Sequence, residues 1–286
     1  MILNDDMLRC LCRTALAEDV GSGDATTLAV VPEHLETEAH FITRQECVCA
    51  GLPIVAALFA ELDRNLVVTP HVQEGAFCRP GTTLATVAGP ARAILTGERT
   101  ALNFLQRLCG VATVTRRYVT ALGDSSTRIL DTRKTTPGMR LLEKYAVTMG
   151  GGQNHRLGLY DRIMIKDNHR EMAKFAGPDS IARAVRACRE KYPRLEIEVE
   201  ADSLEEAAAA AAAGVEYILL DNMTDAEMAE AIRIIAGRAR TDASGGITLE
   251  RLPRLRNLGL DFISVGALTH SAPAIDIGLD IICPEQ

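Results

Sequence analysis

Residues 196–222 read EIEVEADSLEEAAAAAAAGVEYILLDN, and this stretch decides the fold. It begins and ends with a short apolar run, at 196–200 and at 217–221. Between the runs, Ser203 and Glu206 fit a capping box, in which two side chains satisfy free backbone donors at the start of a helix. The alanines that follow have high helix propensity, and a glycine ends them. The stretch therefore predicts a strand, a helix and a second, parallel strand.

The same alternation of short apolar runs and helical segments extends over the second half of the chain. Short apolar runs, several of them followed by helix-start signals, recur at 128–131, 162–166, 240–244 and 262–266. A second capping box lies at 224–227. Repetition of this kind implies parallel strands with helical crossovers, so the predicted fold class is α/β.

The first part of the chain, up to about residue 110, has a mixed pattern. Helices are expected at 6–18 and 53–62, and strands at 36–44, 66–71 and 82–88. Glycines and prolines lie between these segments, as is typical of turns. The pattern predicts a small domain that contains both helices and strands.

A long helical pattern over 96–122, interrupted by Gly110, connects the two parts of the chain. We expect this helix to bridge two domains, residues 1–112 and residues 113–271. The tail 272–286 is a candidate to pack back on the first domain.

The apolar runs of the second part end in polar, charged or glycine residues. In a parallel barrel the carboxyl ends of the strands meet at one rim, where barrel enzymes have their active sites. Residues far apart in the sequence are therefore predicted to line one pocket, although any single one would also suit a solvated strand end. The strand ends carry Asp131, Arg133, Lys134, Lys166, Asn168, Glu200, Asp221, Asn222, Ser244, Gly245, Gly246, Gly266 and Ala267.

The predicted pocket is basic on one side and acidic on the other. A cluster of cations is costly to desolvate unless an anion compensates it, and arginines bind carboxylates through two hydrogen bonds. Two acids at neighbouring strand ends, Glu200 and Asp221, suit a magnesium ion that keeps water and substrate phosphates as its other ligands. Ion pairing of these acids with Lys134 or Lys166 is a compatible alternative. The cationic candidates are Arg133, Lys134, Arg140, His155, Arg156 and Lys166.

Two glycine-bearing loops follow the last two predicted strands. The segments 243–247 and 264–268 offer backbone N–H groups to a phosphate, and loops in this place commonly form a phosphate site in barrels. Taken singly, each loop would also suit an ordinary turn. Three further glycines at 150–152 precede His155 and Arg156, and this loop would be able to close on a bound anion.

The composition argues against several classes of function. A net charge of −7 and a pI of about 5.5 disfavour nucleic acid as a partner, because binding its backbone needs a basic face. No apolar stretch reaches the ~20 residues of a membrane helix, and Asp5 and Asp6 disfavour a secretory signal. We therefore expect a cytoplasmic protein without a membrane partner. The eight cysteines include no Cys-x-x-Cys spacing, which favours free, mostly buried thiols over zinc.

At these residues the sequence resembles the quinolinate phosphoribosyltransferases, also called carboxylating nicotinate-nucleotide pyrophosphorylases. The segments DTRKTTPG (131–138), NHRLGL (154–159) and IKDNH (165–169), in this order and spacing, are very specific to that family. The resemblance spans nearly the whole chain. The other matching segments are EDVGSGDATT (18–27), GERTALNFLQRLCGVAT (97–113), EVEADSLEEA (198–207), LLDNM (219–223), ASGGI (243–247) and ISVGALTHS (263–271).

The resemblance implies an N-terminal α/β sandwich domain followed by an incomplete, TIM-like α/β barrel of about seven strands. It also implies a head-to-tail homodimer in which the partner's N-terminal domain covers the barrel mouth, with a higher oligomer left open. The implied activity is that of a pentosyltransferase. It moves phosphoribosyl from phosphoribosyl pyrophosphate to quinolinate with loss of pyrophosphate and CO2, which gives nicotinate mononucleotide for NAD biosynthesis.

The resemblance also implies roles for particular residues. Glu200 and Asp221 would hold Mg²⁺, directly or through water, and would act with Lys134 as the catalytic residues. The carboxylates of quinolinate would be bound by Arg99 of the partner chain and by Arg133, His155, Arg156 and Lys166. Phosphoribosyl pyrophosphate would be bound by Lys134, Lys166, Ser244, Gly245, Gly246, Gly266 and Ala267.

The sequence departs from the family pattern at two places, and its residues would also suit other functions. Cys109 stands where serine is common and Asp242 where a longer acid is common, but both changes leave the reaction class unchanged. A related molybdenum-associated branch shares the fold and usually lacks the full DTRK and IKDNH pattern. An aldolase-like barrel with Lys166 as a Schiff-base lysine is an alternative enzyme. A regulatory protein that only binds a phosphorylated metabolite would leave Glu200 and Asp221 without a purpose.

Overall fold

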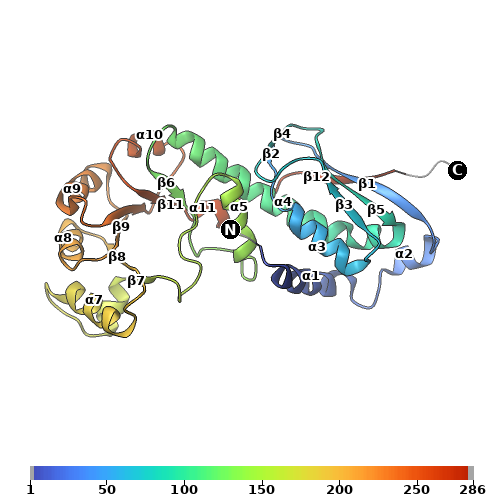
Figure 1. The fold of residues 1–286 in the computed structure, drawn as a ribbon. Coiled ribbons are helices and arrows are strands. Elements are labelled where there is room, and N and C mark those ends of the chain that lie inside the picture. The colour runs from blue at the N-terminus through green and yellow to red at the C-terminus, as the bar shows by residue number, and fades with distance from the viewer. Residues whose placement is uncertain (1–2, 283–286) are drawn as a thin grey trace. The chain divides into compact units, whose positions relative to one another are not determined.

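The chain is an α/β protein that divides into two compact units (Figure 1). The structure, a computed structural model, describes residues 3–282, so the end of the tail with Cys283 lies outside the described residues. The first unit comprises the residues up to Arg116, 135–151 and those from Ala267 on, and the second comprises 117–134 and 152–266. The chain passes between the units more than once. The predicted boundary between two domains at residue 112 therefore stays a prediction.

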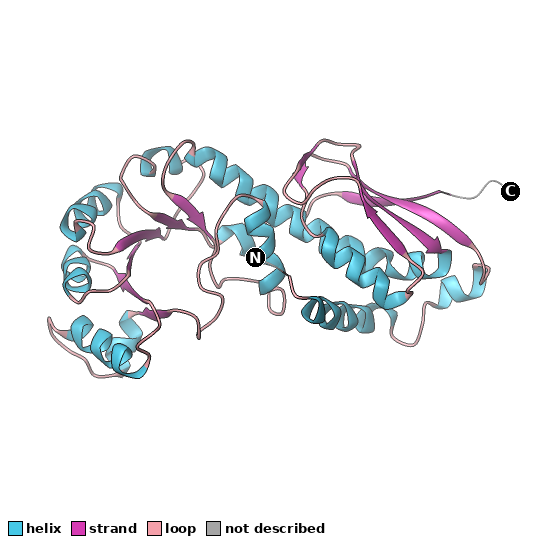
Figure 2. Cartoon of the chain, viewed as in Figure 1, coloured by secondary structure: helices cyan, strands magenta, loops and turns pink. Residues whose placement is uncertain are grey.

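The first unit is built on a four-stranded antiparallel sheet with helices beside it (Figure 2). Phe41 and Phe59 are fully buried with ring centroids 6.2 Å apart, so the sheet and one helix share an apolar core. The strand order is β12-β1-β5-β3. The elements are α1 (Asp5–Val20), α2 (Ala25–Val30), β1 (Glu36–Thr43), β2 (Cys47–Val48), α3 (Leu52–Leu62), β3 (Val67–Pro70), β4 (Phe77–Cys78), β5 (Thr83–Pro90), α5 (Arg140–Met149), α11 (Ala267–His270) and β12 (Ile277–Ile282).

The elements predicted for the first part of the chain are confirmed at α1, α3, β1, β3 and β5. The outer strand β12 was not predicted. It pairs antiparallel with β1, from Glu38 opposite Ile282 to Thr43 opposite Ile277. The last described residues thus complete a sheet whose other strands lie near the start of the chain. A local sequence pattern cannot predict the pairing of two strands that lie so far apart in the chain.

The long helix α4 (Ala91–Leu122) begins in the first unit and ends in the second. The expected interruption at Gly110 was wrong, because the helix continues through it. Glycine is needed there for close packing: a Cβ at residue 110 would lie 2.0 Å from the backbone oxygen of Pro273. None of the helices within residues 3–282, α4 included, is both long and apolar enough to cross a membrane.

The second unit is an open parallel sheet of six strands, with helices between successive strands from β7 to β11, which is a partial TIM-like barrel (Figure 1). The order is β6-β11-β10-β9-β8-β7, and a single parallel bridge between Leu130 and Gln153 adds a seventh segment beside β6. All six predicted strands are confirmed. The elements are β6 (Arg128–Leu130), β7 (Ile163–Ile165), α6 (Asp167–Met172), α7 (Ser180–Lys191), β8 (Ile197–Ala201), α8 (Leu204–Ala212), β9 (Tyr217–Asp221), α9 (Asp225–Ile235), β10 (Arg240–Ser244), α10 (Leu252–Leu255) and β11 (Phe262–Ser264).

A buried polar layer lies within this sheet. Glu198 on β8 and Asp242 on β10 are buried, and the Ser264 hydroxyl donates to Oδ2 of Asp242 at 2.6 Å. The Arg162 guanidinium approaches Oε2 of Glu198 to 3.7 Å and lies 4.0 Å from the ring centroid of Tyr217. Burial raises the pKa of Asp242 well above its ordinary value, and the negative charge of Glu198 raises it further. Asp242 therefore favours its neutral, protonated form.

The substitution Asp242→Asn is expected to flatten the pH dependence of stability. The folded-state pKa of Asp242 lies above the unfolded value of about 4. Its stabilising contribution is therefore complete below that pH and is lost as the pH rises toward the folded-state pKa. The asparagine side chain has a similar shape and cannot ionise. Between about pH 5 and about pH 8 the variant should lose less of its free energy of unfolding than the parent.

Urea unfolding of parent and variant at both pH values measures this difference. Asp124→Asn, at an exposed position of the same unit, is the matched control and should follow the parent. Parallel pH profiles for the parent and Asp242→Asn would show that the buried carboxyl is not the source of the pH dependence.

Candidate active site

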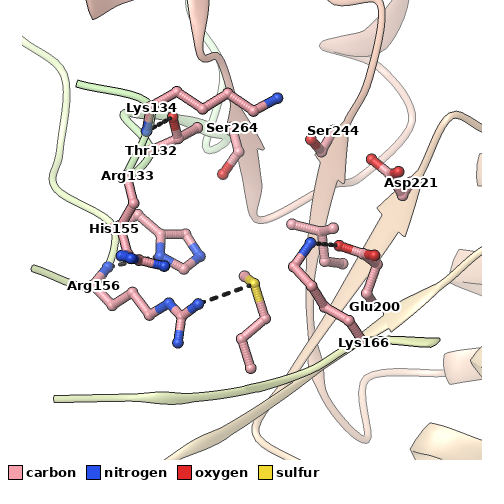
Figure 3. Close-up of a pocket in the computed structure, with 12 residues that line it drawn as sticks. Thr132, Arg133, Lys134, His155, Arg156, Lys166, Glu200, Asp221, Ser244 and Ser264 are labelled. Atoms are coloured by element: carbon pink, nitrogen blue, oxygen red, sulfur yellow. Dashed lines mark hydrogen bonds and ion pairs between the residues drawn. The ribbon is translucent and has the colours of Figure 1, made fainter. Parts of the chain in front are cut away.

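A cavity of about 330 Å³ lies at the carboxyl ends of the strands of the second unit (Figure 3). Each of the six strands, or the loop directly after it, contributes at least one side chain. The convergence predicted from the strand ends is therefore confirmed. The lining residues are Thr132, Arg133, Lys134, His155, Arg156, Met164, Lys166, Glu200, Leu219, Asp221, Ser244 and Ser264.

A buried aspartate holds the basic wall of the cavity. Asp131 directly follows β6 and is fully buried. Its carboxylate accepts hydrogen bonds from Nδ2 of Asn154 at 2.6 Å and from the backbone N–H of His155 at 2.9 Å. Because a buried carboxylate needs such donors, Asp131 ties the segment 132–134 to the segment 154–156. The motifs at 131–138 and 154–159 thereby meet.

Arg156 is a buried cation with incomplete charge compensation. Only 9% of the residue is exposed, and its guanidinium donates to the backbone oxygen of Arg162 at 3.1 Å. Burial and then the positive charge of Arg133 lower the pKa of Arg156, while the carboxylates of Glu198 and Asp161 act in the opposite direction. A lowered arginine pKa means that the surroundings disfavour its charge. A bound anion would remove that cost.

The two ring nitrogens of His155 have different neighbours. Nδ1 accepts a hydrogen bond from the backbone N–H of Arg156 at 2.7 Å, and Nε2 lies 2.8 Å from Oε2 of Glu198. The acceptor role of Nδ1 places the ring hydrogen on Nε2. The approach to Glu198 is short but not well aligned for a hydrogen bond. Although Nε2 and oxygens of Glu198 and Asp242 lie within 4.8 Å of one another, a protonated Nε2 is no metal ligand.

The acidic side of the cavity contains an ion pair. Nζ of Lys166, just after β7, donates to Oε2 of Glu200 on β8 (Figure 3). The Lys166 side chain is 41% exposed and that of Glu200 is 14% exposed. This pair is one of the compatible ion pairs weighed from the sequence. The partly exposed lysine can exchange partners at a modest cost.

Three carboxylates could hold a cation at the same rim. Oxygens of Glu200, Asp202 and Asp221 lie within 4.8 Å of one another. Asp202 lies at the exposed rim. Partial desolvation and the neighbouring charges of Glu206 and Asp221 raise the pKa of Asp202. Oxygen ligands of this kind suit Mg²⁺, and a cation would relieve their mutual repulsion, so the residues fit the expected metal.

Two of the cations proposed from the sequence lie elsewhere. Arg99 is on α4 in the first unit, where it lines a separate cavity with Asp19 and Asp24. Arg140 begins α5, also in the first unit, and its Nε donates to the Thr135 hydroxyl at 3.1 Å. Neither lines the cavity of the second unit.

The expected phosphate-binding loops follow β10 and β11. Gly245 and Gly246 have φ angles of 87° and 58°, a backbone region that glycine adopts without strain. Gly266 is the last residue of the second unit, and Ala267 is the first residue of α11. The cavity lining itself includes the Ser244 end of β10 and Ser264 of β11 rather than these four residues.

Several residues of the site were not singled out from the sequence. The cavity is also lined by Thr132, Met164, Leu219 and Ser264, and Asp202 joins the carboxylate cluster. Leu219 lies two residues before Asp221, and side chains two apart on a strand share a face. Counting back two residues from the end of each strand would have identified Leu219. It would also have identified Met164, which lies two residues before Lys166. Asp202 lies after the end of β8, so counting back along the strand would not have identified it.

The family of the chain emerges from comparison with known proteins. Residues 24–109 match the family model for the N-terminal domain of quinolinate phosphoribosyl transferase. Residues 111–280 match that for its C-terminal domain.

Curated relatives extend over nearly the whole chain. A probable carboxylating nicotinate-nucleotide pyrophosphorylase of Bacillus subtilis is 42% identical over 280 residues, which cover 98% of this chain and 95% of the relative. A protein of the same name from Synechocystis is 44% identical over 271 residues, with 93% and 90% covered. The chloroplastic enzyme of Arabidopsis thaliana is 39% identical, with 96% and 82% covered.

Solved structures agree in fold. NadC from Streptococcus pyogenes superposes with a TM-score of 0.91 at 40% identity, covering 99% of this chain and 100% of the other. The nicotinate-nucleotide pyrophosphorylase of Francisella tularensis gives a TM-score of 0.90 at 37% identity, with 98% of each chain covered. Sequence motifs, fold and these comparisons lead to one conclusion: this chain belongs to the quinolinate phosphoribosyltransferase family.

Proposed function

We propose that this protein transfers phosphoribosyl from phosphoribosyl pyrophosphate to quinolinate with decarboxylation, giving nicotinate mononucleotide, pyrophosphate and CO2. One observation carries the proposal. Two arginines and two lysines line a single cavity together with two carboxylates, at the carboxyl ends of the parallel strands. A dicarboxylate matches the cations, and a sugar phosphate that carries a cation matches the acids. Relatives over nearly the whole chain are named for this reaction.

Quinolinate is placed in the basic half of the cavity. The guanidinium groups of Arg133 and Arg156 are able to bind its two carboxylates bidentately, and the anion would remove the charge cost at Arg156. His155 lines the same wall, and its Nδ1 holds the Arg156 backbone. Lys166 completes the set after it leaves Glu200.

Phosphoribosyl pyrophosphate is placed across the acidic half. Its 5′-phosphate suits the backbone N–H groups around Ser244–Gly246 and Gly266–Ala267. Lys134 lines the cavity and supplies a further cation for the phosphates. Glu200 and Asp221, with Asp202 beside them, would hold Mg²⁺, which neutralises charge on the pyrophosphate when bound.

The proposed reaction uses positioning and electrostatics more than acid–base chemistry. The C1′–oxygen bond to pyrophosphate breaks and leaves positive charge on the ribose, which the carboxylates of Glu200 and Asp221 stabilise. The pyridine nitrogen forms the new bond to C1′ and becomes positively charged. The bond from C2 to its carboxylate then breaks, CO2 leaves, and the electron pair on C2 takes up a proton. Lys166 is our candidate for the proton donor.

We also propose a homodimer in which Arg99 reaches the active site of the partner chain. Arg99 lines a cavity of the first unit rather than that of the second, as expected if its substrate contact lies on another chain. A cytoplasmic location is part of the proposal, because the seven cysteines within residues 3–282 are free thiols, which a reducing compartment preserves. Cell fractionation with antibody detection tests the location.

Release of CO2 from carboxyl-labelled quinolinate tests the activity. We expect release only when phosphoribosyl pyrophosphate and Mg²⁺ are both present, and no nucleotide from nicotinate, because the pocket has cations for two carboxylates. Nucleotide formation from nicotinate alone would keep the transferase mechanism and overturn the substrate. Binding without turnover of any pyridine base would favour a regulatory binding protein.

Two substitutions on opposite walls should separate binding from catalysis. Arg133→Ala removes a charged, bidentate contact and should raise the quinolinate KM about 10- to 100-fold. Glu200→Gln keeps the shape, removes the negative charge that faces the ribose, and should lower kcat about 100-fold. Its quinolinate Kd should change much less than its kcat, because Glu200 acts on quinolinate only through its ion pair with Lys166. Steady-state kinetics and quinolinate titration measure these effects, and parental kinetics for Arg133→Ala would remove the carboxylate assignment.

Mixing two impaired variants, assayed at a quinolinate concentration well below the parental KM, tests the contribution of Arg99 across the dimer. Arg99→Ala and Arg133→Ala proteins, unfolded and refolded together, form hybrids with one intact site if Arg99 acts on the partner. About a quarter of parental activity should return in a random mixture. A mixture as inactive as its components would show that Arg99 serves its own chain or no active site.

A further inference from the structure

Asn222, the residue after the acid at the end of β9, has a backbone conformation that few residues adopt. Its φ angle is 55°, in the left-handed region, where asparagine, aspartate and glycine are the usual residues. It belongs to the segment LLDNM (219–223), in which only Asp221 received a role above. The conformation turns the side chain of Asn222 back toward the strand ends, where it makes two contacts.

One end of the Asn222 side chain binds the neighbouring acid. Its Nδ2 donates to Oδ2 of Asp221 at 2.7 Å. This hydrogen bond fixes the direction of one oxygen of the Asp221 carboxylate. Asp221 is also among the residues that line the cavity.

The backbone N–H and the side-chain oxygen of Asn222 both lie against the loop after β10. Its backbone N–H donates to the oxygen of Ser244 at 3.0 Å. A Cβ added to Gly245 would lie 2.1 Å from Oδ1 of Asn222, so the amide occupies the space that any other residue at 245 would need. Gly245 has a φ angle of 87°, which also favours glycine. Asn222 and Gly245 therefore form a close contact between two strand ends.

The backbone of this region has other supports that do not need the Asn222 amide. The Thr224 hydroxyl and Glu227 form the capping box at the start of α9. Arg251 donates to the backbone oxygens of Met223 at 2.7 Å and Gly245 at 3.3 Å. Several residues thus hold the backbone, whereas the amide hydrogen bond to the Asp221 carboxylate comes from Asn222.

We propose that Asn222 is a positioning residue that fixes the carboxylate of Asp221 relative to the loop Ser244–Gly246. This inference rests on the proposed function, in which Asp221 serves the pyrophosphate end of the substrate and the loop serves its 5′-phosphate. A single side chain then sets the spacing between the two ends of one sugar phosphate. Quinolinate, which lies on the opposite wall, does not depend on it.

Two variants test the role of the amide. Asn222→Gly keeps the left-handed backbone and removes the side chain. Asn222→Asp keeps the shape and tolerates the same backbone, but it places a carboxylate where the amide donated to Asp221. Asn257→Gly, in an exposed turn of the same unit, is the matched control. If Asn222 only supported the backbone, both variants would behave like the parent.

The readout is calorimetric binding to the full chain without turnover. Phosphoribosyl pyrophosphate with Mg²⁺, in the absence of quinolinate, should bind both Asn222 variants about tenfold more weakly than the parent, as for a lost hydrogen bond to a charged group. Quinolinate alone should bind all proteins within about twofold. In turnover, the KM for phosphoribosyl pyrophosphate should rise while that for quinolinate stays constant.

The outcomes separate this inference from the proposed function. Parental binding of phosphoribosyl pyrophosphate by a folded Asn222→Asp protein overturns the role of the amide, and so does an equal weakening of quinolinate binding. Circular dichroism checks folding, and Asn222→Asp alone decides the question if Asn222→Gly does not fold. A parent that binds phosphoribosyl pyrophosphate but turns over no pyridine base contradicts the proposed reaction and leaves the binding test valid. A parent that does not bind it overturns both.

Discussion

The parallel register of the six-stranded sheet is the constraint on which the site depends. Hydrogen bonding aligns Ile165 with Val199, Glu200 with Leu219 and Asp221 with Ser244, so that neighbouring strands end at the same level. Side chains alternate between the two faces of a strand. A strand shifted by one residue would turn its polar end residue away from the cavity. Residues from Thr132 to Ser264 meet in one cavity because the register is fixed.

The alternation of side chains along each strand places a second layer of polar residues next to the layer that lines the cavity. Glu198 lies two residues before Glu200, and Asp242 lies two residues before Ser244, so each pair shares a face of the sheet. The layer below is buried, and its carboxyls contact His155, Arg162 and Ser264. Burying charged groups in such a layer costs desolvation free energy unless the charges are compensated. A neutral Asp242 reduces that cost and leaves one negative charge, on Glu198, near the cations of the basic wall.

The cavity has a basic wall and an acidic wall, and polar contacts hold the side chains of each. The basic wall is held by Asp131, and the acidic wall is held by Lys166 and Asn222. In each case an opposite charge or a hydrogen-bond donor keeps a polar group in place. The Lys166–Glu200 pair differs from the others because it is partly exposed, and it can open when a substrate offers Lys166 another partner.

The sequence by itself determined the alternation of strands and helices, because apolar spacing, capping boxes and glycine stops act over a few residues. It also determined which strand ends carry cations, acids and glycines, and the motifs at 131–138, 154–159 and 165–169 indicated the family. Only the tertiary structure decided that β12 completes the first sheet, that Gly110 allows close packing in a continuous helix, and that Asn222 lies against Gly245. It also revealed Asp202 and Ser264 beside the expected residues. The pairing of β12, the packing at Gly110 and the contact at Gly245 join segments distant in the chain, and a local pattern gives the face of a side chain within one element but not the distance between elements.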